Sequence, residues 1–330
     1  MKIKILLGIS LCICILCSCD PKNKDIIEPL QPTIEQPEQP EEPNKPAEPE
    51  EPQKPEEQAP IKEIININNK YMIIGTNDWY AITYGNKKYV AVGNNMFTTT
   101  SIDGENWTTP KAIQSSNSRL YSIAYGNEKY VTFNELGYLS TSTDGINWTT
   151  PRIPISGMKN KVGGLTFIND KFIGVTLINN NSYAIYSTDG ENWVHYKIEN
   201  GNFNIIMYGN GIYVAVSVNG VVCTSIDGEN WTINAKELSP QSTWNDGTFG
   251  NGKFVVINGE TGNKHIATST DGKNWSIKVV GTSYFKCIAF GDGKFIATNY
   301  YKKVFTSTDG ENWTQLDDLP FEANDIIFVQ

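Results

Sequence analysis

The sequence predicts an all-β protein built as a β-propeller, and three observations lead to this prediction. A seven-residue motif of the form SxDGxNW occurs six times, at intervals of 38 to 45 residues. Each interval also contains short β-prone runs separated by Gly, Asn and Asp turns, and helical periodicity is missing throughout. Four antiparallel strands in a unit of about 40 residues are typical of a propeller blade.

The motif itself is expected to be structural. Its Asp-Gly pair supplies the positive φ that a tight hairpin needs, and the Ser hydroxyl and Asp carboxylate can bond backbone N–H groups of the turn. We expect the Trp to begin the outermost strand and to pack against the next blade. The residues concerned are Asp103, Asp144, Asp189, Asp227, Asp271 and Asp309, with Trp107, Trp148, Trp193, Trp231, Trp275 and Trp313.

This motif resembles the Asp-box, the bacterial neuraminidase repeat of sialidase-like propellers, whose pattern is S-x-D-x-G-x-x-W. The resemblance covers residues 61–330, although the Gly here follows the Asp directly and the turn is one residue shorter. For sialidases the resemblance also implies three arginines that hold the substrate carboxylate. Lysine does not reproduce that bidentate contact, and the chain has only Arg119 and Arg152. Sialidase activity is therefore excluded.

The two ends of the repeat region indicate how the ring closes. Residues 324–330 read as one more innermost strand, and residues 61–75 read as one or two outer strands without the motif. Together they predict a seventh, composite blade that closes the ring. The alternative is a six-bladed ring with loose terminal strands.

The first 60 residues differ from the repeats. Residues 1–18 read as a signal peptide, with two lysines before a short apolar run, and this run ends in a sequence that resembles the bacterial lipobox. The resemblance implies lipidation at Cys19. Residues 19–60 follow as an acidic, Pro-rich stalk, because a proline at every third position favours extended polyproline II structure. We therefore expect a bacterial envelope lipoprotein, surface-exposed or facing the periplasm, that contacts the membrane through its lipid.

Charge and residue counts narrow the function. Residues 61–330 carry 24 acidic and 21 basic side chains with no basic patch, which argues against nucleic acid as a partner. Cys223 and Cys287 fall in apolar strand patterns and are expected to be buried thiols. The sequence contains no metal-ligand spacing, no nucleophile motif and no phosphate loop, so we expect no metal and no cofactor. The propeller is expected to be monomeric.

The variable loops lie on the face opposite the motif turns, and binding on a fixed scaffold concentrates in such loops. Counting back five residues from the last aromatic of each innermost strand gives a column that we expect to ring the channel mouth. Aromatic faces there suit sugar rings, and core capping is the alternative. The predicted rim consists of Trp79, Tyr80, Tyr121, Phe203, Trp244, Tyr284, Phe285, Tyr300 and Tyr301.

Two carboxylates stand out in the next column. Asp246 and Asp325 replace small residues three positions before the same aromatics, so they are expected to point toward the channel or a seam between blades. As a pair they can serve as a general acid and base, or they can simply face water or a neighbouring loop. The leading hypothesis is non-catalytic binding of an extracellular glycan or protein. The alternatives are a polysaccharide hydrolase or lyase using these two residues, and a scaffold subunit of an envelope complex.

Overall fold

The computed structural model describes residues 64–67, 70–75, 78–198, 201–234, 238, 243–259, 265–280 and 284–329. The expected signal peptide, Cys19 and the stalk lie outside the described residues. All described residues belong to one compact unit, residues 55–330. Within this part of the chain, no helix is long and apolar enough to cross a membrane.

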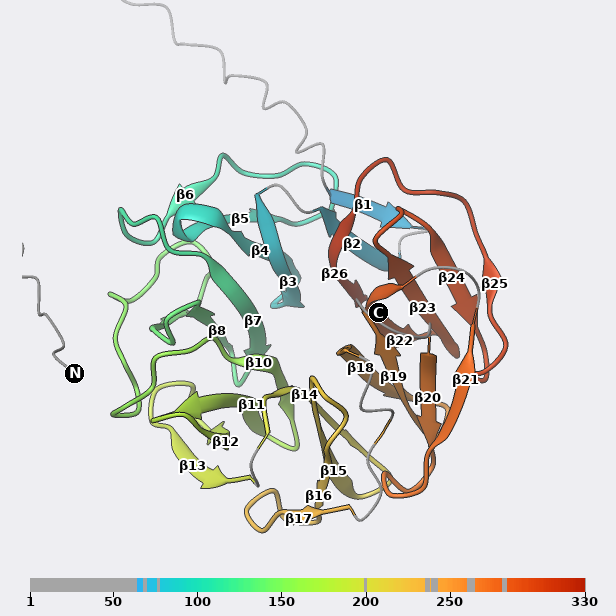
Figure 1. Ribbon diagram of the computed structural model, residues 1–330. Helices are drawn as coiled ribbons and strands as arrows, with labels where there is room; N and C mark the ends of the chain where they lie inside the picture. The colour runs from blue at the N-terminus through green and yellow to red at the C-terminus, as the bar shows by residue number, and fades with distance from the viewer. Residues whose placement is uncertain are drawn as a thin grey trace, which may run out of the picture. The chain divides into compact units, whose positions relative to one another are not determined.

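The described strands form seven antiparallel sheets arranged as the blades of a β-propeller, which confirms the predicted fold (Figure 1). One strand of each blade lies nearest the axis, and these inner strands contact one another around the ring. The inner strands are β3 (Trp79–Gly85), β7 (Leu120–Gly126), β10 (Gly163–Ile168), β14 (Phe203–Gly209), β18 (Trp244–Gly250), β22 (Phe285–Gly291) and β26 (Ala323–Phe328).

The remaining strands extend each blade outward. The second strands are β2 (Tyr71–Gly75), β4 (Lys88–Gly93), β8 (Lys129–Asn134), β11 (Lys171–Ile178), β15 (Ile212–Ser217), β19 (Lys253–Asn258) and β23 (Lys294–Asn299). The third strands are β1 (Ile64–Ile67), β5 (Phe97–Ser101), β9 (Leu139–Ser142), β12 (Asn181–Ser187), β16 (Val222–Ser225), β20 (His265–Ser269) and β24 (Val304–Ser307). The fourth strands are β6 (Lys111–Ala112), β13 (Val194–Lys197), β17 (Thr232–Ile233), β21 (Ser276–Val279) and β25 (Thr314–Gln315).

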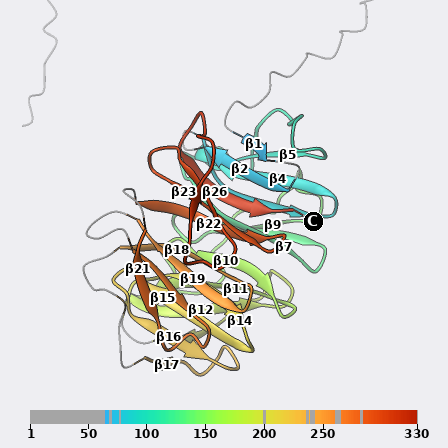
Figure 2. The same ribbon diagram turned by 90° about the vertical axis from the view of Figure 1, so that its right-hand side faces the viewer.

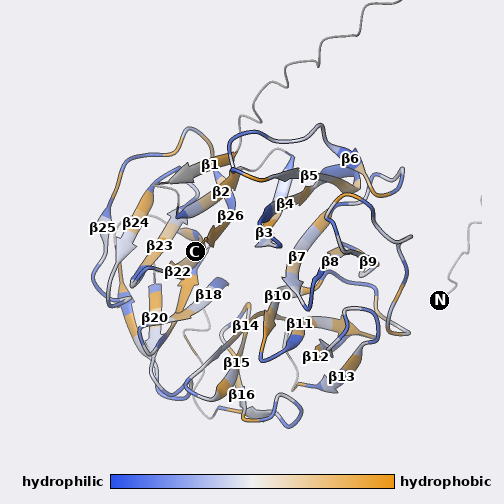
Figure 3. Ribbon diagram, turned by 180° about the vertical axis from the view of Figure 1, so that it is seen from behind, coloured by the Kyte–Doolittle hydropathy of each residue, from blue (hydrophilic) through white to orange (hydrophobic). Residues whose placement is uncertain are grey.

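We number the blades 1 to 6 from β3 to β25 and call the sheet of β26, β2 and β1 the closing blade. A one-turn 3-10 helix, η1 (Asn94–Met96), joins β4 to β5 in blade 1. In blade 2 the described residues form three strands, and Arg152 pairs with Leu139 where other blades have a fourth strand. Hydrophobic residues follow the strands, while hydrophilic residues colour many of the connections (Figure 3).

The closing blade combines both ends of the repeat region, as predicted. The C-terminal strand β26 pairs antiparallel with β2, which in turn pairs with β1. Figure 2 shows β2 and β26 side by side although they come from opposite ends of the sequence. The seven-bladed interpretation is therefore confirmed over the six-bladed one.

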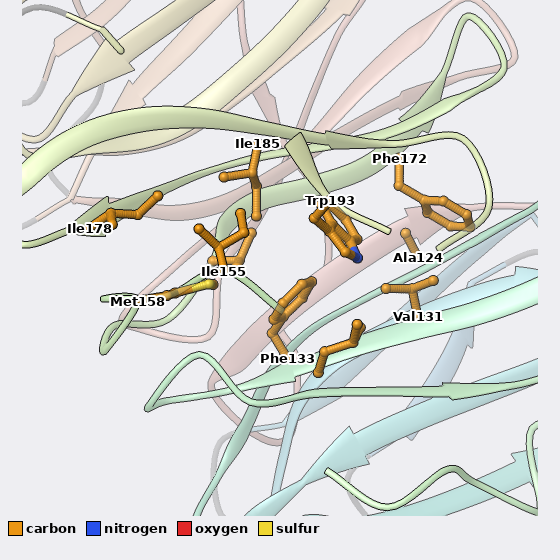
Figure 4. Close-up of a cluster of buried hydrophobic side chains, with 11 residues drawn as sticks. Ala124, Val131, Phe133, Ile155, Met158, Phe172, Ile178, Ile185 and Trp193 are labelled. Atoms are coloured by element: carbon orange, nitrogen blue, oxygen red, sulfur yellow. The ribbon is translucent and has the colours of Figure 1, made fainter. Parts of the chain in front are cut away.

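The motif tryptophans pack against the preceding blade, so the expectation that they pack against the next blade is wrong. Trp193 of blade 3 lies 5.1 Å from the ring of Phe133 on β8 of blade 2, in the cluster that Figure 4 shows between these blades. The reason is that the motif turn folds back toward the blade before it. At Gly190 of the same turn, a Cβ atom would lie 2.8 Å from Val131 on that blade.

A second contact between blades repeats at the far end of the inner strands. The glycine that ends β18, Gly250, lies against the ring of Phe290 from the next blade, and a Cβ atom there would come within 2.1 Å of that ring. Its backbone has an ordinary φ, so the glycine serves the close approach and not a turn. The same contact recurs where β3, β7, β14 and β22 end in glycine. These contacts fix the distance between the inner strands and hence the bore of the channel.

Candidate functional site

The blades present two faces of different character. In blades 1 to 6, the turn face carries the hairpin between the first and second strands and the motif turn. The loop face carries the connections between second and third strands and between blades. Side chains on the turn face are committed to holding neighbouring blades together: Asn251 Nδ2 donates to the carbonyl of Thr308 in the next motif turn at 2.8 Å, and Asn210 Nδ2 donates to that of Thr270 in the same way.

Each motif turn is closed by its own side chains. In the first, the Ser101 hydroxyl donates to Asp103 Oδ1 at 2.9 Å and accepts the Gly104 N–H at 2.8 Å. Asp103 Oδ1 also accepts two backbone N–H groups, and Oδ2 accepts the Asn106 amide at 2.8 Å. Trp107 Nε1 donates to the Gly104 carbonyl at 3.1 Å. The motif Asn, whose role the sequence analysis did not identify, therefore completes the turn.

These bonds stabilise the ionised Asp. Hydrogen bonds from the Asn106 side chain and then from backbone N–H groups hold the pKa of Asp103 well below its usual range. The pKa of the motif aspartate is lowered in the other turns as well, where the same donors outweigh the effect of burial. With its acceptors occupied, the motif carboxylate is not available for a ligand.

The axis of the ring holds a cavity of about 840 Å³. Its wall follows the inner strands, and its loop-face end lies where these strands begin. We call that end the channel mouth. Six blades each have a β-bulge near the start of the inner strand, and the extra residue lines the cavity. These bulge residues are Tyr80, Tyr121, Asn204, Asn245, Lys286 and Asn324.

Blade 3 has a wider irregularity at the same level. Gly163 and Gly164 begin its inner strand, and the ladder resumes at Thr166. A Cβ atom at Gly163 would lie 2.7 Å from the carbonyl oxygen of Asn204, and Gly164 has a φ of 59°. Glycine is therefore needed here for the approach of the next blade. Because these glycines have no side chain, blade 3 contributes Lys161 to the channel mouth. Lys161 lies just before β10 and also lines the cavity.

The predicted aromatic column does not ring the mouth. Trp79, Phe203, Trp244 and Phe285 are all buried in the hydrophobic clusters, and Trp244 is 0% exposed. The reason is the bulge, which adds one residue to the strand and turns the preceding side chain into the packing between blades. Phe285, for example, lies in one hydrophobic cluster with Val255 and Ile257 of the preceding blade. The core-capping alternative is correct for these four residues.

The other five predicted rim residues remain accessible. Tyr80, Tyr121 and Tyr300 are half-buried and line the cavity. Tyr284 is half-buried, and its carbonyl accepts the Tyr300 N–H at 3.4 Å. Tyr301 is 61% exposed. The aromatic part of the mouth therefore consists of tyrosines.

Two clusters of tyrosines and cations face the mouth. In the first, the rings of Tyr80 and Tyr121 are 4.9 Å apart. The Arg119 guanidinium lies 5.9 Å from the Tyr80 centroid, and Lys161 Nζ lies 5.2 Å from the Tyr121 centroid. We call these four residues the tyrosine–cation cluster.

In the second cluster, Lys286 Nζ lies 5.1 Å from the centroid of Tyr300 and forms an ion pair with Glu322. The Tyr300 hydroxyl accepts a hydrogen bond from Asn245 Nδ2 at 2.9 Å. In the second cluster, the side chains are therefore already engaged in contacts between neighbouring blades. The tyrosine–cation cluster is the more open of the two.

Asp246 and Asp325 lie deeper, where each joins two blades. Asp246 Oδ2 accepts the N–H of Ile288 on the next inner strand at 2.9 Å, and Asp325 Oδ2 accepts that of Ile82 at 3.0 Å. Burial raises the pKa of Asp246 to about 6, and burial together with the charge of Asp246 raises the pKa of Asp325 to about 7. Both residues line the cavity and both face a seam, which the sequence analysis left as alternatives.

The raised pKa values of Asp246 and Asp325 make the free energy of unfolding depend on pH between about 4 and about 7. Because the folded chain holds these protons more tightly than the unfolded chain, the free energy of unfolding falls as the pH rises from about 4 to about 7. We expect the melting temperature of an Asp246→Asn/Asp325→Asn variant to fall less between pH 4.5 and pH 8 than that of the unchanged chain. Calorimetry at several pH values measures this, with the exposed Asp317→Asn as control. An unchanged pH dependence in the double variant would contradict the assignment.

The two remaining thiols are buried, as predicted. Cys223 and Cys287 are both inaccessible to solvent, and Cys287 Sγ lies 2.8 Å from Thr298 Oγ1. Burial raises the pKa of Cys287 far above its usual range. In the described part of the chain, no group of three or more His, Cys, Asp or Glu side chains is placed to hold a metal ion.

Four of the bulge residues and two cations were missed from the sequence. Asn204, Asn245, Lys286 and Asn324 are polar residues that each directly follow a buried residue at the start of an inner strand, a pattern that marks a bulge once the repeats are aligned. Arg119 and Lys161 lie in loops, where nothing local distinguishes them from other surface cations. Their proximity to the tyrosines depends on the ring geometry.

Comparisons with known proteins show the fold alone. No protein-family model matches the chain, and no curated protein matches it. Among solved structures, it is similar to YCF48 bound to D1 peptide, with 18% identity over 78% of this chain and 87% of that chain, and a TM-score of 0.59. It is also similar to virginiamycin B lyase from Staphylococcus aureus, with 15% identity over 76% and 90% and a TM-score of 0.62. A third similar structure is that of a streptogramin B lyase, with 12% identity over 78% of this chain and 92% of that chain, and a TM-score of 0.61.

Proposed function

We propose that the propeller is a non-catalytic module that binds an extracellular glycan or protein at the channel mouth. The observation that carries this proposal is the ring of bulge residues, one from each of six blades, around a cavity of about 840 Å³. A ligand at this position meets side chains from many blades, which suits specific recognition. On the turn face, in contrast, the polar side chains form hydrogen bonds between neighbouring blades.

The similar structures support a binding role without identifying the ligand. YCF48, a propeller of comparable size, is bound to a peptide in its structure. We further propose that the chain is an Asp-box-type propeller, because all six motif turns have the same hydrogen bonds although each is one residue shorter than the Asp-box pattern.

We place this module on the bacterial envelope, held by a lipid on Cys19 and carried by the acidic stalk of residues 19–60. The support is the lipobox-like sequence and the proline spacing. A Cys19→Ser variant expressed in a bacterial host is expected to move from the membrane fraction to the soluble fraction. Retention of that variant in the membrane fraction would contradict lipid anchoring.

The binding proposal is tested by screening the full chain on arrays of glycans and of peptides. Binding of at least one probe is expected, and a Tyr80→Ala/Tyr300→Ala variant is expected to weaken it by about tenfold or more, in the range of aromatic contacts at binding sites. Ile102→Ala, which changes an exposed residue of a motif turn, is the matched control and should bind normally. Failure to bind any probe, or equal loss in the control, would argue against the channel mouth.

A second candidate is a polysaccharide hydrolase or lyase that uses Asp246 and Asp325. The raised pKa of both carboxyls inside one cavity favours it, because catalytic acids are often tuned in this way. Against it, each carboxyl already accepts two backbone N–H groups. Cleavage of any polysaccharide by the full chain, lost in Asp246→Asn, would establish this candidate.

A further inference from the structure

Arg119 and Lys161 are exposed cations that form no ion pair with a described acidic side chain. The ion pairs of the described residues involve seven other pairings, and neither side chain forms one with a described carboxylate. Glu135 lies close enough for its charge to act on Arg119, but it forms no ion pair with the guanidinium, and its Oε1 accepts the backbone N–H of Arg119 at 3.3 Å. Both cations are exposed, and Lys161 lines the cavity while Arg119 lies over Tyr80, which also lines it. They are therefore free to meet a negative group.

The tyrosines below them are covered in a way that disfavours sugar stacking. Tyr80 and Tyr121 pack on each other, and each also has a cation over its ring. The Arg119 guanidinium additionally donates to the Tyr121 hydroxyl at 3.4 Å, which orients it. A sugar ring needs an open aromatic face, whereas a carboxylate needs only the outward N–H groups of the cations. The cluster is thus suited to ionic recognition.

The surroundings of Arg119 favour a peptide as the source of that carboxylate. Leu136 and Tyr138 are 50% and 39% exposed in the connection that follows β8. This connection is tied to Arg119, because the Glu135 N–H donates to the Arg119 carbonyl at 2.9 Å. An exposed apolar pair beside an unpaired arginine can accept an apolar side chain next to an acidic one. Alternation of acidic and apolar groups is a property of peptides and not of sugar chains.

We propose that the tyrosine–cation cluster binds an acidic peptide segment, whose Asp or Glu carboxylate lies between Arg119 and Lys161 while a neighbouring apolar side chain contacts Leu136 and Tyr138. This inference rests on the proposed function and specifies its ligand. Residues 61–330 are net acidic, so an acidic peptide is not attracted by the propeller as a whole. Binding must come from the local cluster.

The test compares three fluorescent probes on the full chain: the peptide Glu-Glu-Leu-Glu-Glu-Leu, its glutamine counterpart Gln-Gln-Leu-Gln-Gln-Leu, and hexagalacturonate. Fluorescence anisotropy is expected to show at least about tenfold tighter binding of the acidic peptide than of either other probe, as for a charge-assisted contact. Its affinity should fall as salt rises from 50 to 500 mM, because exposed charges are screened. Equal binding of the two peptides, or tighter binding of hexagalacturonate, would overturn the inference.

Two variants locate the contact. Arg119→Gln/Lys161→Gln is expected to lose about tenfold or more of the affinity for the acidic peptide. Lys159→Gln removes one positive charge from an exposed residue of the connection that contains Lys161 and is expected to stay within about twofold. Equal loss in both would overturn the inference. If the acidic peptide does not bind while an array probe still binds through Tyr80 and Tyr300, the inference fails and the proposed function stands. If neither binds, both fail.

Discussion

A chain that ends at Pro320, without strand β26, is expected to lose cooperative folding. β26 supplies the inner strand of the closing blade and contacts the inner strands on both sides, β22 and β3. Its removal takes away the buried Ile326 and Val329, each worth about 1.5–3 kcal/mol, and the partly buried Phe328, and such a loss is a large part of the stability of a typical domain. It also removes the Asp325 carboxylate that accepts the Ile82 N–H.

Thermal unfolding followed by circular dichroism measures this effect. The truncated chain should show no sharp transition, while a chain lacking only Gln330 should melt like the full chain. Adding a synthetic peptide of residues 321–330 is expected to restore part of the transition, since the missing strand pairs only through β2. A truncated chain that melts cooperatively within a few degrees of the full chain would mean that the ring does not depend on this closure.

The second large effect is expected from Asp271→Ala in the fifth motif turn. The substitution leaves the N–H groups of Lys273 and Asn274 and the Asn274 amide without their acceptor. By analogy with the loss of a side-chain cap at a helix end, the cost is about 1–2 kcal/mol. Because the pKa of Asp271 is lowered in the folded chain, its contribution is present above pH 4 and is lost as the pH falls below that value.

Denaturant unfolding at pH 7 and at pH 3 tests this prediction. The difference between Asp271→Ala and the unchanged chain should be largest at pH 7 and should shrink at pH 3. Lys273→Ala, an exposed change two residues away, is the control and is expected to alter stability by less than about 0.5 kcal/mol. An Asp271→Ala variant as stable as the unchanged chain at pH 7 would show that the turn is held by other contacts.

The fold could be predicted because its determinants are local and repeated. The Asp-Gly turns, the strand lengths and the unmatched segments at residues 61–75 and 324–330 each carry their own signal. Together they led to seven blades and a composite closing blade. Trp193 was predicted to pack against the next blade, but it packs against the preceding one. The twist of the ring decides toward which neighbouring blade a motif turn folds, and the motif itself does not contain this information.

The channel mouth could be predicted only in part, and the reason is the β-bulge. Alternation along a regular strand would have put Trp244 and Phe285 at the mouth, but one extra residue exchanged them for Asn245 and Lys286. A bulge of this kind does not change the amino-acid composition of the strand. It also requires no Gly or Pro that would mark its position in the sequence. Asp246 was identified because a carboxylate among small residues is conspicuous in any register.

The central claim is that ligands bind at the loop-face channel mouth while the motif turns serve the fold. Hydrogen–deuterium exchange of the full chain, with and without the tightest-binding array probe, tests it most directly. The account predicts added protection at residues 79–81, 119–122 and 159–164, with the six motif turns unchanged. Protection confined to the motif turns or to the outer strands would contradict it.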